Sequence, residues 1–288
     1  METLPLSIRP SMMPPGVRDM MTFRSAIRTQ IDDILSDGTK NINPSIFTHL
    51  RDDPSLPSSE KSPQRLEDEA TLMTMAGSYS PMLSLTTAHY HLLAQPSIMT
   101  KLRAELAATD NTTTRLEQLP YLSGIIHESH RLTFGLTGRN ARVCPDENII
   151  YTDNPNKVSY SLPRGTSLSA STLVIHTDET IFPDPWTFDP DRWTLKDEAL
   201  LTRRRKAMLG FGRGPRICIG MHLANAEMAM ALAAVARWDM RLFETTEEDV
   251  AFRHDYHVLC PRLGSKGVRV RVLGRAGGMM GRVGGVIK

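Results

Sequence analysis

The chain has 288 residues, with 34 Lys and Arg against 32 Asp and Glu, which gives a formal net charge of +2 at pH 7. This near-neutral balance excludes nucleic-acid binding driven by bulk charge, and a composition of 40% hydrophobic and 23% charged residues excludes intrinsic disorder. The longest apolar stretch, 228–236, is far shorter than the roughly 20 residues of a membrane-spanning helix. Three cysteines exclude a disulfide scaffold and favour an intracellular, reducing compartment.

Apolar periodicity predicts helices in the first half of the chain. The segment 20–36 carries apolar residues at helical spacing, namely Phe23, Ile27, Ile31 and Ile34. A polar linker rich in Pro and Ser follows over 52–65. Further helices are predicted over 66–94, 96–106 and 116–132.

Short strands are predicted in the second half of the chain. Residues 149–151 and 167–171 have strand composition, and a Pro-Arg-Gly turn at 163–165 is expected to join them. Residues 220–238 form an apolar helix that is typical of a buried position. Valine alternates with arginine over 268–272, which indicates a half-buried strand. Residues 274–288 are rich in glycine and have the composition of a flexible basic tail.

The most informative segment is Phe211-Gly-Arg-Gly-Pro-Arg-Ile-Cys-Ile-Gly220, a glycine-rich loop that leads into the apolar helix. Its glycines permit turns that aim N–H groups at the sulfur of Cys218, and the following helix N-terminus adds positive potential. Both effects favour a thiolate. Because no second Cys or His stands at metal-ligand spacing, the thiolate suits a single axial ligand to a metal held otherwise, as in haem. A single cysteine alone would also fit a small buried side chain.

This loop resembles the haem-binding loop F-x-x-G-x-R-x-C-x-G of the cytochrome P450 family, whose defining positions are occupied by Phe211, Gly214, Arg216, Cys218 and Gly220. Upstream, Glu128 and Arg131 match the E-x-x-R of the family's K helix, and residues 188–193 (FDPDRW) are similar to its P-E-R-F segment. The resemblance implies a buried structural network of Glu128, Arg131 and Arg192. The alternative is a surface ion pair on one helix, which would contribute little.

The resemblance also implies which residues contact the cofactor. Arg142 (or Arg139) and Arg216 would hold the haem propionates, because a guanidinium matches a carboxylate bidentately. The alternative for Arg139 and Arg142 is a solvated surface charge. The remaining loop contacts expected at the haem are Phe211, Gly212 and Gly220.

In the family, a long I helix carries the oxygen-activating segment, and residues 76–81 (AGSYSP) stand at its place. Ala76 and Gly77 would leave room for dioxygen, and the hydroxyl of Ser80 would assist proton delivery. Tyr79 replaces the acid of the family pattern, and a phenol, with an ordinary pKa of about 10, is a poor carboxyl relay. Pro81 would free a backbone carbonyl and kink the helix. The alternative is a kinked core helix without a role in chemistry.

The implied fold is mainly helical with small β-sheets. Its haem-binding core would span 66–273, after a leader, a helix G-like segment and a linker over 1–65, and before the tail at 274–288. All matched motifs belong to the family's C-terminal half, so we expect the N-terminal part, with any membrane anchor, to be missing. Membrane contact, at the cytosolic face of the endoplasmic reticulum, would occur only through that part.

The implied function is a haem-thiolate monooxygenase, which inserts one oxygen atom from dioxygen into an apolar small molecule with electrons from an NADPH-dependent reductase. The motifs resemble fungal secondary-metabolism members, which predicts a terpenoid or another secondary metabolite as substrate. The basic run 203–206 is a solvated face, a weak nuclear signal or, by the resemblance, a docking site for an acidic electron donor. Two alternatives stay open: a truncated, inactive fragment or haem-binding remnant, and a partner-binding module without enzymatic activity.

Overall fold

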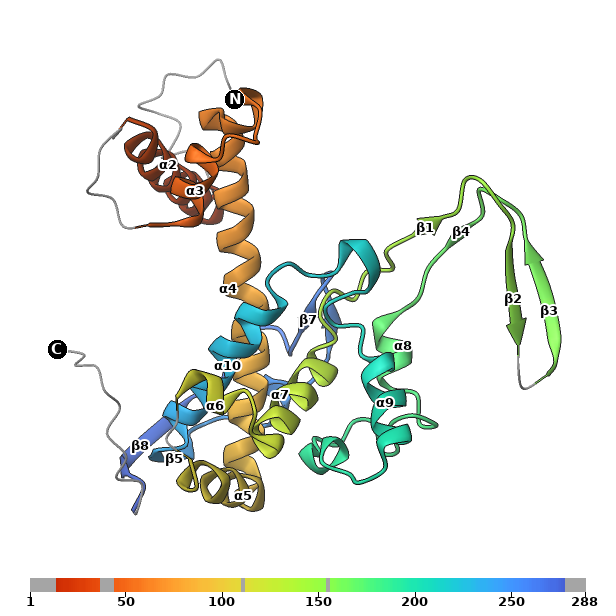
Figure 1. The fold of residues 1–288 in the computed structure, drawn as a ribbon. Coiled ribbons are helices and arrows are strands. Elements are labelled where there is room, and N and C mark those ends of the chain that lie inside the picture. The colour runs from red at the N-terminus through yellow and green to blue at the C-terminus, as the bar shows by residue number, and fades with distance from the viewer. Residues whose placement is uncertain (1–13, 37–43, 110–111, 154–155, 278–288) are drawn as a thin grey trace. The chain divides into compact units, whose positions relative to one another are not determined.

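The computed structural model describes residues 14–36, 44–109, 112–153 and 156–277 (Figure 1). Helices predominate in it, with small two-stranded antiparallel sheets, so the predicted fold class is confirmed. Contacts divide the chain into two units, 1–79 and 80–288. Most of the predicted tail, 278–288, lies outside the described residues.

The first unit is a small helical cluster. Helix α2 (Pro15–Ser36) packs with α3 (Ile46–Asp52), the short helix η1 (Ser58–Lys61) and the first part of α4 (Pro63–Ala94). The apolar residues predicted to share a face do so, since Ile27 and Ile31 are buried against Leu66 and Ala70 of α4. This cluster explains why an otherwise polar α2 forms a stable helix, because an amphipathic helix gains most of its stability from packing.

Helix α4 is a single element of 32 residues that continues through Pro81. It begins three residues before the predicted start, at Pro63, whose missing N–H has no intrahelical acceptor at that position in any case. Residues up to Tyr79 belong to the first unit, and Ser80–Ala94 belong to the second.

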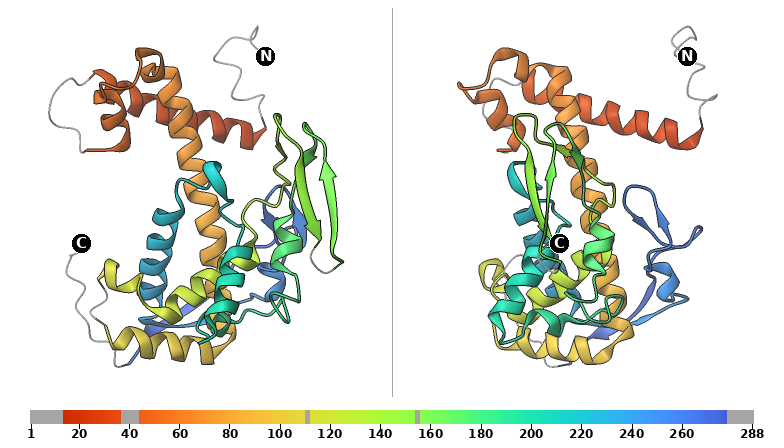
Figure 2. Two further views of the ribbon diagram at one scale, coloured as in Figure 1. Left: turned by 45° about the vertical axis from the view of Figure 1, so that its right-hand side comes forward. Right: turned by 90° about the vertical axis from the view of Figure 1, so that its right-hand side faces the viewer.

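In the second unit, the end of α4 packs with α5 (Pro96–Ala107), α6 (Thr113–Leu116), α7 (Pro120–Thr133) and α10 (Met221–Val235) (Figures 1 and 2). The side chains that fill this core without exposure include Leu92, Leu102, Leu106, Leu122, Ile125, Met228 and Leu232.

The helix predicted over 116–132 is in fact two helices. Pro120 disfavours a helical conformation at the residue before it and instead occupies the first turn of α7. The carboxylate of Glu105 accepts the N–H groups of Tyr121 and Leu122, each at 2.8 Å, and so caps the start of α7.

The predicted pairing of 149–151 with 167–171 is wrong. Strand β2 (Ile149–Asp153) pairs with β3 (Val158–Leu162), whereas β4 (Ser167–Leu168) pairs with β1 (Arg142–Val143). The connection between β2 and β3 is only four residues long, so closing it costs less entropy than the longer connection that we expected. The predicted strand at 268–272 is β8 (Val270–Arg275), which pairs with β5 (Trp238–Leu242). A smaller pair joins β6 (His254–Asp255) to β7 (Leu259–Cys260).

The remaining elements lie between the first strands and α10, or near the end of the chain. They are α8 (Thr172–His176), η2 (Pro190–Trp193), α9 (Glu198–Ala207), η3 (Gly214–Arg216) and η4 (Glu247–Asp249). Helix α10 was expected to be buried because it is mostly apolar, but Leu223 is 62% exposed and Met230 is 44% exposed. Only the face of α10 that packs on α6 and α7 is buried. Across the described residues, no helix has the length and hydropathy needed to cross a membrane.

Candidate functional site

The cysteine loop, residues 211–220, connects α9 to α10. The N–H of Cys218 donates to Phe211 O at 2.8 Å and closes the loop, and the N–H of Ile217 donates to Gly214 O at 3.1 Å. Gly212 and Gly214 have φ values of +70° and +78°, a left-handed conformation that glycine adopts without strain. The glycines of the motif are therefore required by the backbone path.

The sulfur of Cys218 lies beside the first turn of α10. A Cβ atom placed on Gly220, the N-cap residue of that helix, would be 3.9 Å from Cys218 Sγ. The side chain is an exposed free thiol, with the exposed Ile217 and Ile219 on either side of it.

The donor set at this loop is a single thiol. Among the residues that the structure describes, no group of three or more His, Cys, Asp or Glu side chains could hold a metal ion. A single cysteine sulfur fits a metal whose other ligands come from a prosthetic group, as in thiolate-ligated haem. The exposed Arg216, on the same loop, adds a cation that could pair with a carboxylate of that group.

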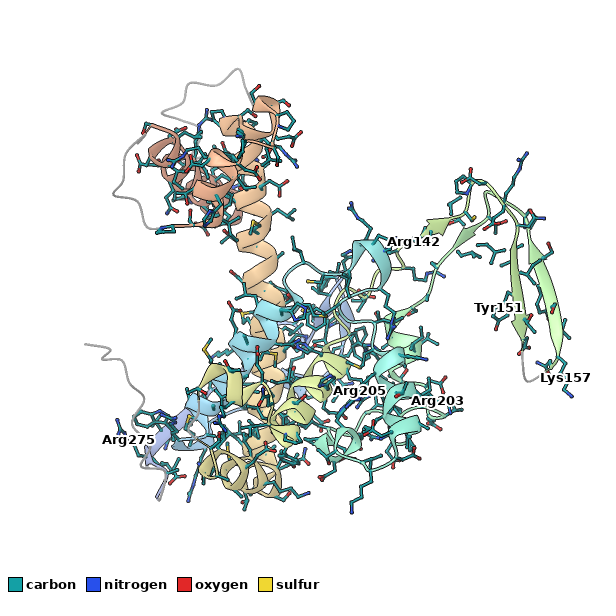
Figure 3. The ribbon with its side chains drawn as sticks, viewed as in Figure 1. Arg142, Tyr151, Lys157, Arg203, Arg205 and Arg275 are labelled. Atoms are coloured by element: carbon teal, nitrogen blue, oxygen red, sulfur yellow. The ribbon has the colours of Figure 1, made fainter. Side chains whose placement is uncertain are left out.

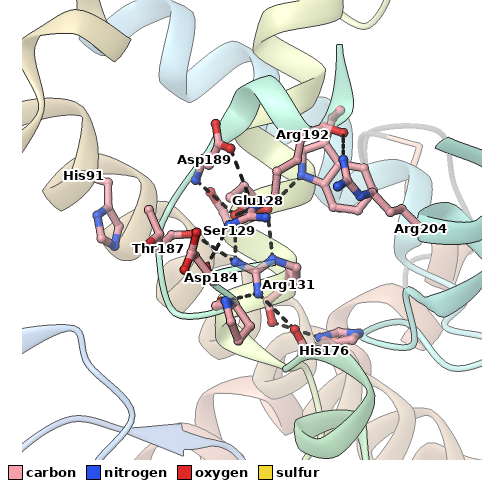
Figure 4. A network of polar contacts seen from close by, with 12 residues as sticks. His91, Glu128, Ser129, Arg131, His176, Asp184, Thr187, Asp189, Arg192 and Arg204 are labelled. Atoms are coloured by element: carbon pink, nitrogen blue, oxygen red, sulfur yellow. Dashed lines mark hydrogen bonds and ion pairs between the residues drawn. The ribbon is translucent and has the colours of Figure 1, made fainter. Parts of the chain in front are cut away.

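Glu128 and Arg131 lie on one face of α7 and are both completely buried (Figure 4). Glu128 Oε1 accepts from Arg131 Nη2 at 2.7 Å, and Oε2 accepts from Arg131 Nε at 3.0 Å. Arg192 Nε lies 3.3 Å from Glu128 Oε1, an ion-pair distance without hydrogen-bond geometry. The interpretation of Glu128 and Arg131 as a surface pair is therefore wrong.

Two residues that the sequence did not single out complete this network. Trp193 Nε1 donates to Glu128 Oε2 at 2.8 Å, and Arg204 Nη1 donates to Arg192 O at 2.7 Å. Arg204 belongs to the basic run that was interpreted as a solvated face or docking site, but it is buried. Arg203 and Arg205, on the same helix α9, are exposed (Figure 3).

His130, which the sequence did not single out, connects several elements. It is buried on α7, with Nδ1 3.2 Å from Ser84 Oγ and Nε2 3.1 Å from Asn225 Oδ1. Its ring meets the ring of Phe211 edge-on, with centroids 4.7 Å apart. Burial lowers the pKa of His130 to about 4, so the imidazole is neutral near pH 7. Its spacing to Glu128 and Arg131 gave no signal of this contact with the cysteine loop.

The other predicted site residues are placed as follows. Arg142 is exposed on β1, and its Nη1 donates to Ala141 O at 3.1 Å (Figure 3). Ser80 is exposed on α4 and belongs to the second unit, with Cys218 and Arg216. Three further exposed residues of α4 belong to the first unit, namely Ala76, Gly77 and Tyr79. Their roles stay predictions.

A family model described as Cytochrome P450 matches residues 18–259. The chain is 34% identical over 248 residues to the Cytochrome P450 monooxygenase TRI4 of Trichoderma arundinaceum, a match that covers 83% of this chain and 47% of the relative. It is 36% identical over 237 residues to the Cytochrome P450 monooxygenase pbrB of Penicillium brasilianum, covering 80% of this chain and 45% of the relative. The chain thus spans about half the length of the curated relatives it matches.

Among solved structures, the crystal structure of a cytochrome P450 named CYP102L1 is similar, with a TM-score of 0.70 and 20% sequence identity. The match covers 96% of this chain and 61% of that chain. At this level of identity the likeness shows the fold, and it confirms the fold predicted from the motifs.

Proposed function

Because this chain belongs to the cytochrome P450 family, whose cofactor is thiolate-ligated haem, we propose that it is a monooxygenase acting on an apolar small molecule. The observation that carries the proposal is the exposed thiol of Cys218 beside the first turn of α10, in a loop with the family's cysteine motif. The reaction would consume dioxygen, two electrons and two protons, and would yield the oxygenated product and water.

The haem, when bound, would supply the activation of dioxygen. The residues of this chain would hold the haem and transfer protons. Cys218 would ligate the haem iron through its sulfur. Arg216 and Arg142 would each pair with a propionate through the guanidinium group. Ser80 would hold a proton at Oγ and pass it on, and a serine hydroxyl rotates more freely than a threonine hydroxyl.

Electrons would come from an NADPH-dependent reductase. The exposed guanidinium groups of Arg203 and Arg205 on α9 would steer an acidic surface of that donor protein toward the chain. The substrate would be a terpenoid or another secondary metabolite, a class that the motifs favour and that fits fungal relatives named as monooxygenases. The location would be intracellular, at the cytosolic face of the endoplasmic reticulum.

Carbon monoxide tests the haem-thiolate part of this proposal. The chain is reconstituted with haem, reduced and exposed to carbon monoxide, and the red-shifted Soret band of a thiolate-ligated complex is recorded. We expect the band to disappear in Cys218→Ala and to persist in the matched control Cys260→Ala, which removes another free cysteine. Haem bound without the band, or a band that survives in Cys218→Ala, would refute the assignment.

Turnover tests the remaining part. The haem-loaded chain, an NADPH-dependent reductase and isotopically labelled dioxygen are supplied with a panel of terpenoid hydrocarbons. We expect one labelled oxygen atom in a product, with matching NADPH consumption. Thiolate-ligated haem that oxygenates no member of the panel would favour the alternative of a haem-binding remnant.

A further inference from the structure

His176 is the last residue of α8 and is completely buried. Its Nδ1 lies 2.9 Å from Arg131 O, and the backbone N–H of Leu209 donates to its Nε2 at 2.9 Å. Because the N–H of Leu209 can only donate, Nε2 must carry a lone pair, and Nδ1 must carry the hydrogen that Arg131 O accepts. The two contacts therefore require one neutral tautomer of the imidazole.

The contact with Leu209 lies two residues before the cysteine loop begins. Within the part of the chain that the structure describes, two hydrogen bonds tie residues 209–218 to other segments. One is the bond from Leu209 to His176, and the other runs from Arg213 Nη2 to Arg205 O at 2.8 Å. Arg205 belongs to the adjacent helix α9, so His176 supplies the hydrogen-bonded link from the loop to α7.

Packing around this link is close. A Cβ atom on Gly135, just after α7, would lie 2.1 Å from Gly210 O, so the two backbones are in direct contact. The ring of Phe134 lies against the ring of His176, with centroids 5.9 Å apart. This apolar enclosure lowers the pKa of His176 to about 4, which keeps the imidazole in the neutral form that both contacts need.

We propose that His176 is a positioning residue for Cys218, which fixes the start of the cysteine loop to the helix that carries Glu128 and Arg131. His176 donates to Arg131 O and accepts from the N–H of Leu209. The backbone then leads from Leu209 to Phe211, whose carbonyl oxygen accepts from the N–H of Cys218. The inference rests on the proposed function, because it assigns His176 to the placement of the haem ligand.

Two variants separate the two contacts of the imidazole. In His176→Gln the side-chain oxygen reaches the position of Nε2 and still accepts from Leu209. In His176→Asn the shorter amide reaches only the position of Nδ1, so it serves Arg131 O and leaves Leu209 without its acceptor. The control is His91→Gln, which removes another imidazole, half-buried and stacked on Phe188 with centroids 4.4 Å apart.

Hydrogen exchange and thiol alkylation are measured first, on the haem-free chain. We expect the amide of Leu209 to exchange roughly 5- to 10-fold faster in His176→Asn than in His176→Gln, as for loss of one hydrogen bond. The rate of Cys218 alkylation by iodoacetamide should change in His176→Asn and stay near wild type in His176→Gln and His91→Gln. In the haem-loaded chain, the thiolate-type Soret band per haem should be weaker in His176→Asn and near wild type in His176→Gln and His91→Gln.

Equal exchange and alkylation rates in the Gln and Asn variants would overturn the proposal, and so would an equal change in His91→Gln. If His176→Asn does not fold, nitrogen NMR of the labelled histidines in the haem-free wild-type chain decides. We expect the neutral tautomer with hydrogen on Nδ1 at pH 7, and either the other tautomer or a charged ring would overturn the proposal. If wild type lacks the Soret band while the haem-free readouts behave as expected, the proposed function fails and not the link through His176.

Discussion

Glu128→Gln removes the negative charge at the centre of the buried network and leaves its neighbours in place. The wild-type carboxylate accepts from Arg131 Nη2 at 2.7 Å and Nε at 3.0 Å, from Trp193 Nε1 at 2.8 Å and from the N–H of Asp189 at 3.1 Å. In the variant, one oxygen becomes an NH₂ group that faces donors, and Arg131 keeps its charge with no exposure to water.

Breaking a buried ion pair on one side costs about 3–5 kcal/mol, because the remaining charge stays buried without a counter-ion. Arg131 retains its hydrogen bonds to backbone carbonyls, so we expect a loss in the lower part of that range, about 3 kcal/mol in the free energy of unfolding. The matched substitution Glu179→Gln, at an exposed position, should change the free energy of unfolding by less than about 0.5 kcal/mol.

The assay is denaturant unfolding followed by circular dichroism. The comparison is valid if the unfolding free energy depends on denaturant concentration with the same slope in each variant. A double variant, Glu128→Gln with Arg131→Met, should not recover the loss, because removing the guanidinium also leaves the carbonyl oxygens of His176, Pro185 and Thr187 without donors. A loss below about 1 kcal/mol in Glu128→Gln would refute the reasoning, since a surface pair would give that value.

Three further predictions concern stability. Burial lowers the pKa of three histidines from the ordinary 6.5 to about 4, so the unfolded chain binds more protons than the folded chain between these pH values. The free energy of unfolding should therefore be highest above pH 6.5 and should decrease as the pH falls toward 4, by up to about 3 kcal/mol per histidine. Unfolding curves recorded at pH 7 and pH 5 test this. A pH-independent midpoint would contradict this assignment to His91, His130 and His176. Gly135→Ala, with φ +64° and its Cβ 2.1 Å from Gly210 O, should cost about 2–4 kcal/mol in the same assay, whereas Gly264→Ala, with φ +76° in open space, should cost only about 1 kcal/mol; equal costs would contradict the close contact. Glu105→Gln weakens the cap of two N–H groups at the start of α7 and should cost about 1 kcal/mol, checked by thermal unfolding, and an unchanged midpoint would contradict the cap.

Relations that are local in the chain could be predicted from the sequence. Glu128 and Arg131 are three residues apart on one helix, so their pairing follows from helix geometry alone. The turns at Gly212 and Gly214 likewise follow from residue type, because few other residues adopt a positive φ. In both cases the partners are fixed before any tertiary contact forms.

Relations that depend on distant segments could not be predicted. Arg204 stands in a run of four basic residues, and no pattern within the run marks it as the buried one. Its burial depends on the carbonyls of Ile181 and Arg192, which lie on other parts of the fold. The partner of β4 and the neutral tautomer of His176 were missed for the same reason, since β1 and Leu209 come from elsewhere in the chain.

The network around Glu128 has a second physical role, which explains why one carboxylate accompanies several guanidinium groups. Residues 177–189 form neither helix nor strand, so their buried carbonyls lack the donors that regular structure would provide. Arginine side chains supply donors to Ile181 O, Asp184 O, Pro185 O and Thr187 O in this segment. Arg131 also donates to His176 O at the end of α8.

The desolvation of each guanidinium is thus offset by carbonyl oxygens as well as by Glu128. A hydrophobic replacement of the whole network would remove the charges but leave these carbonyls unsatisfied, which is costly in the interior. The irregular segment continues directly into η2 and α9 and then into the cysteine loop, so the arginines that satisfy its carbonyls also fix the path of the chain toward Cys218.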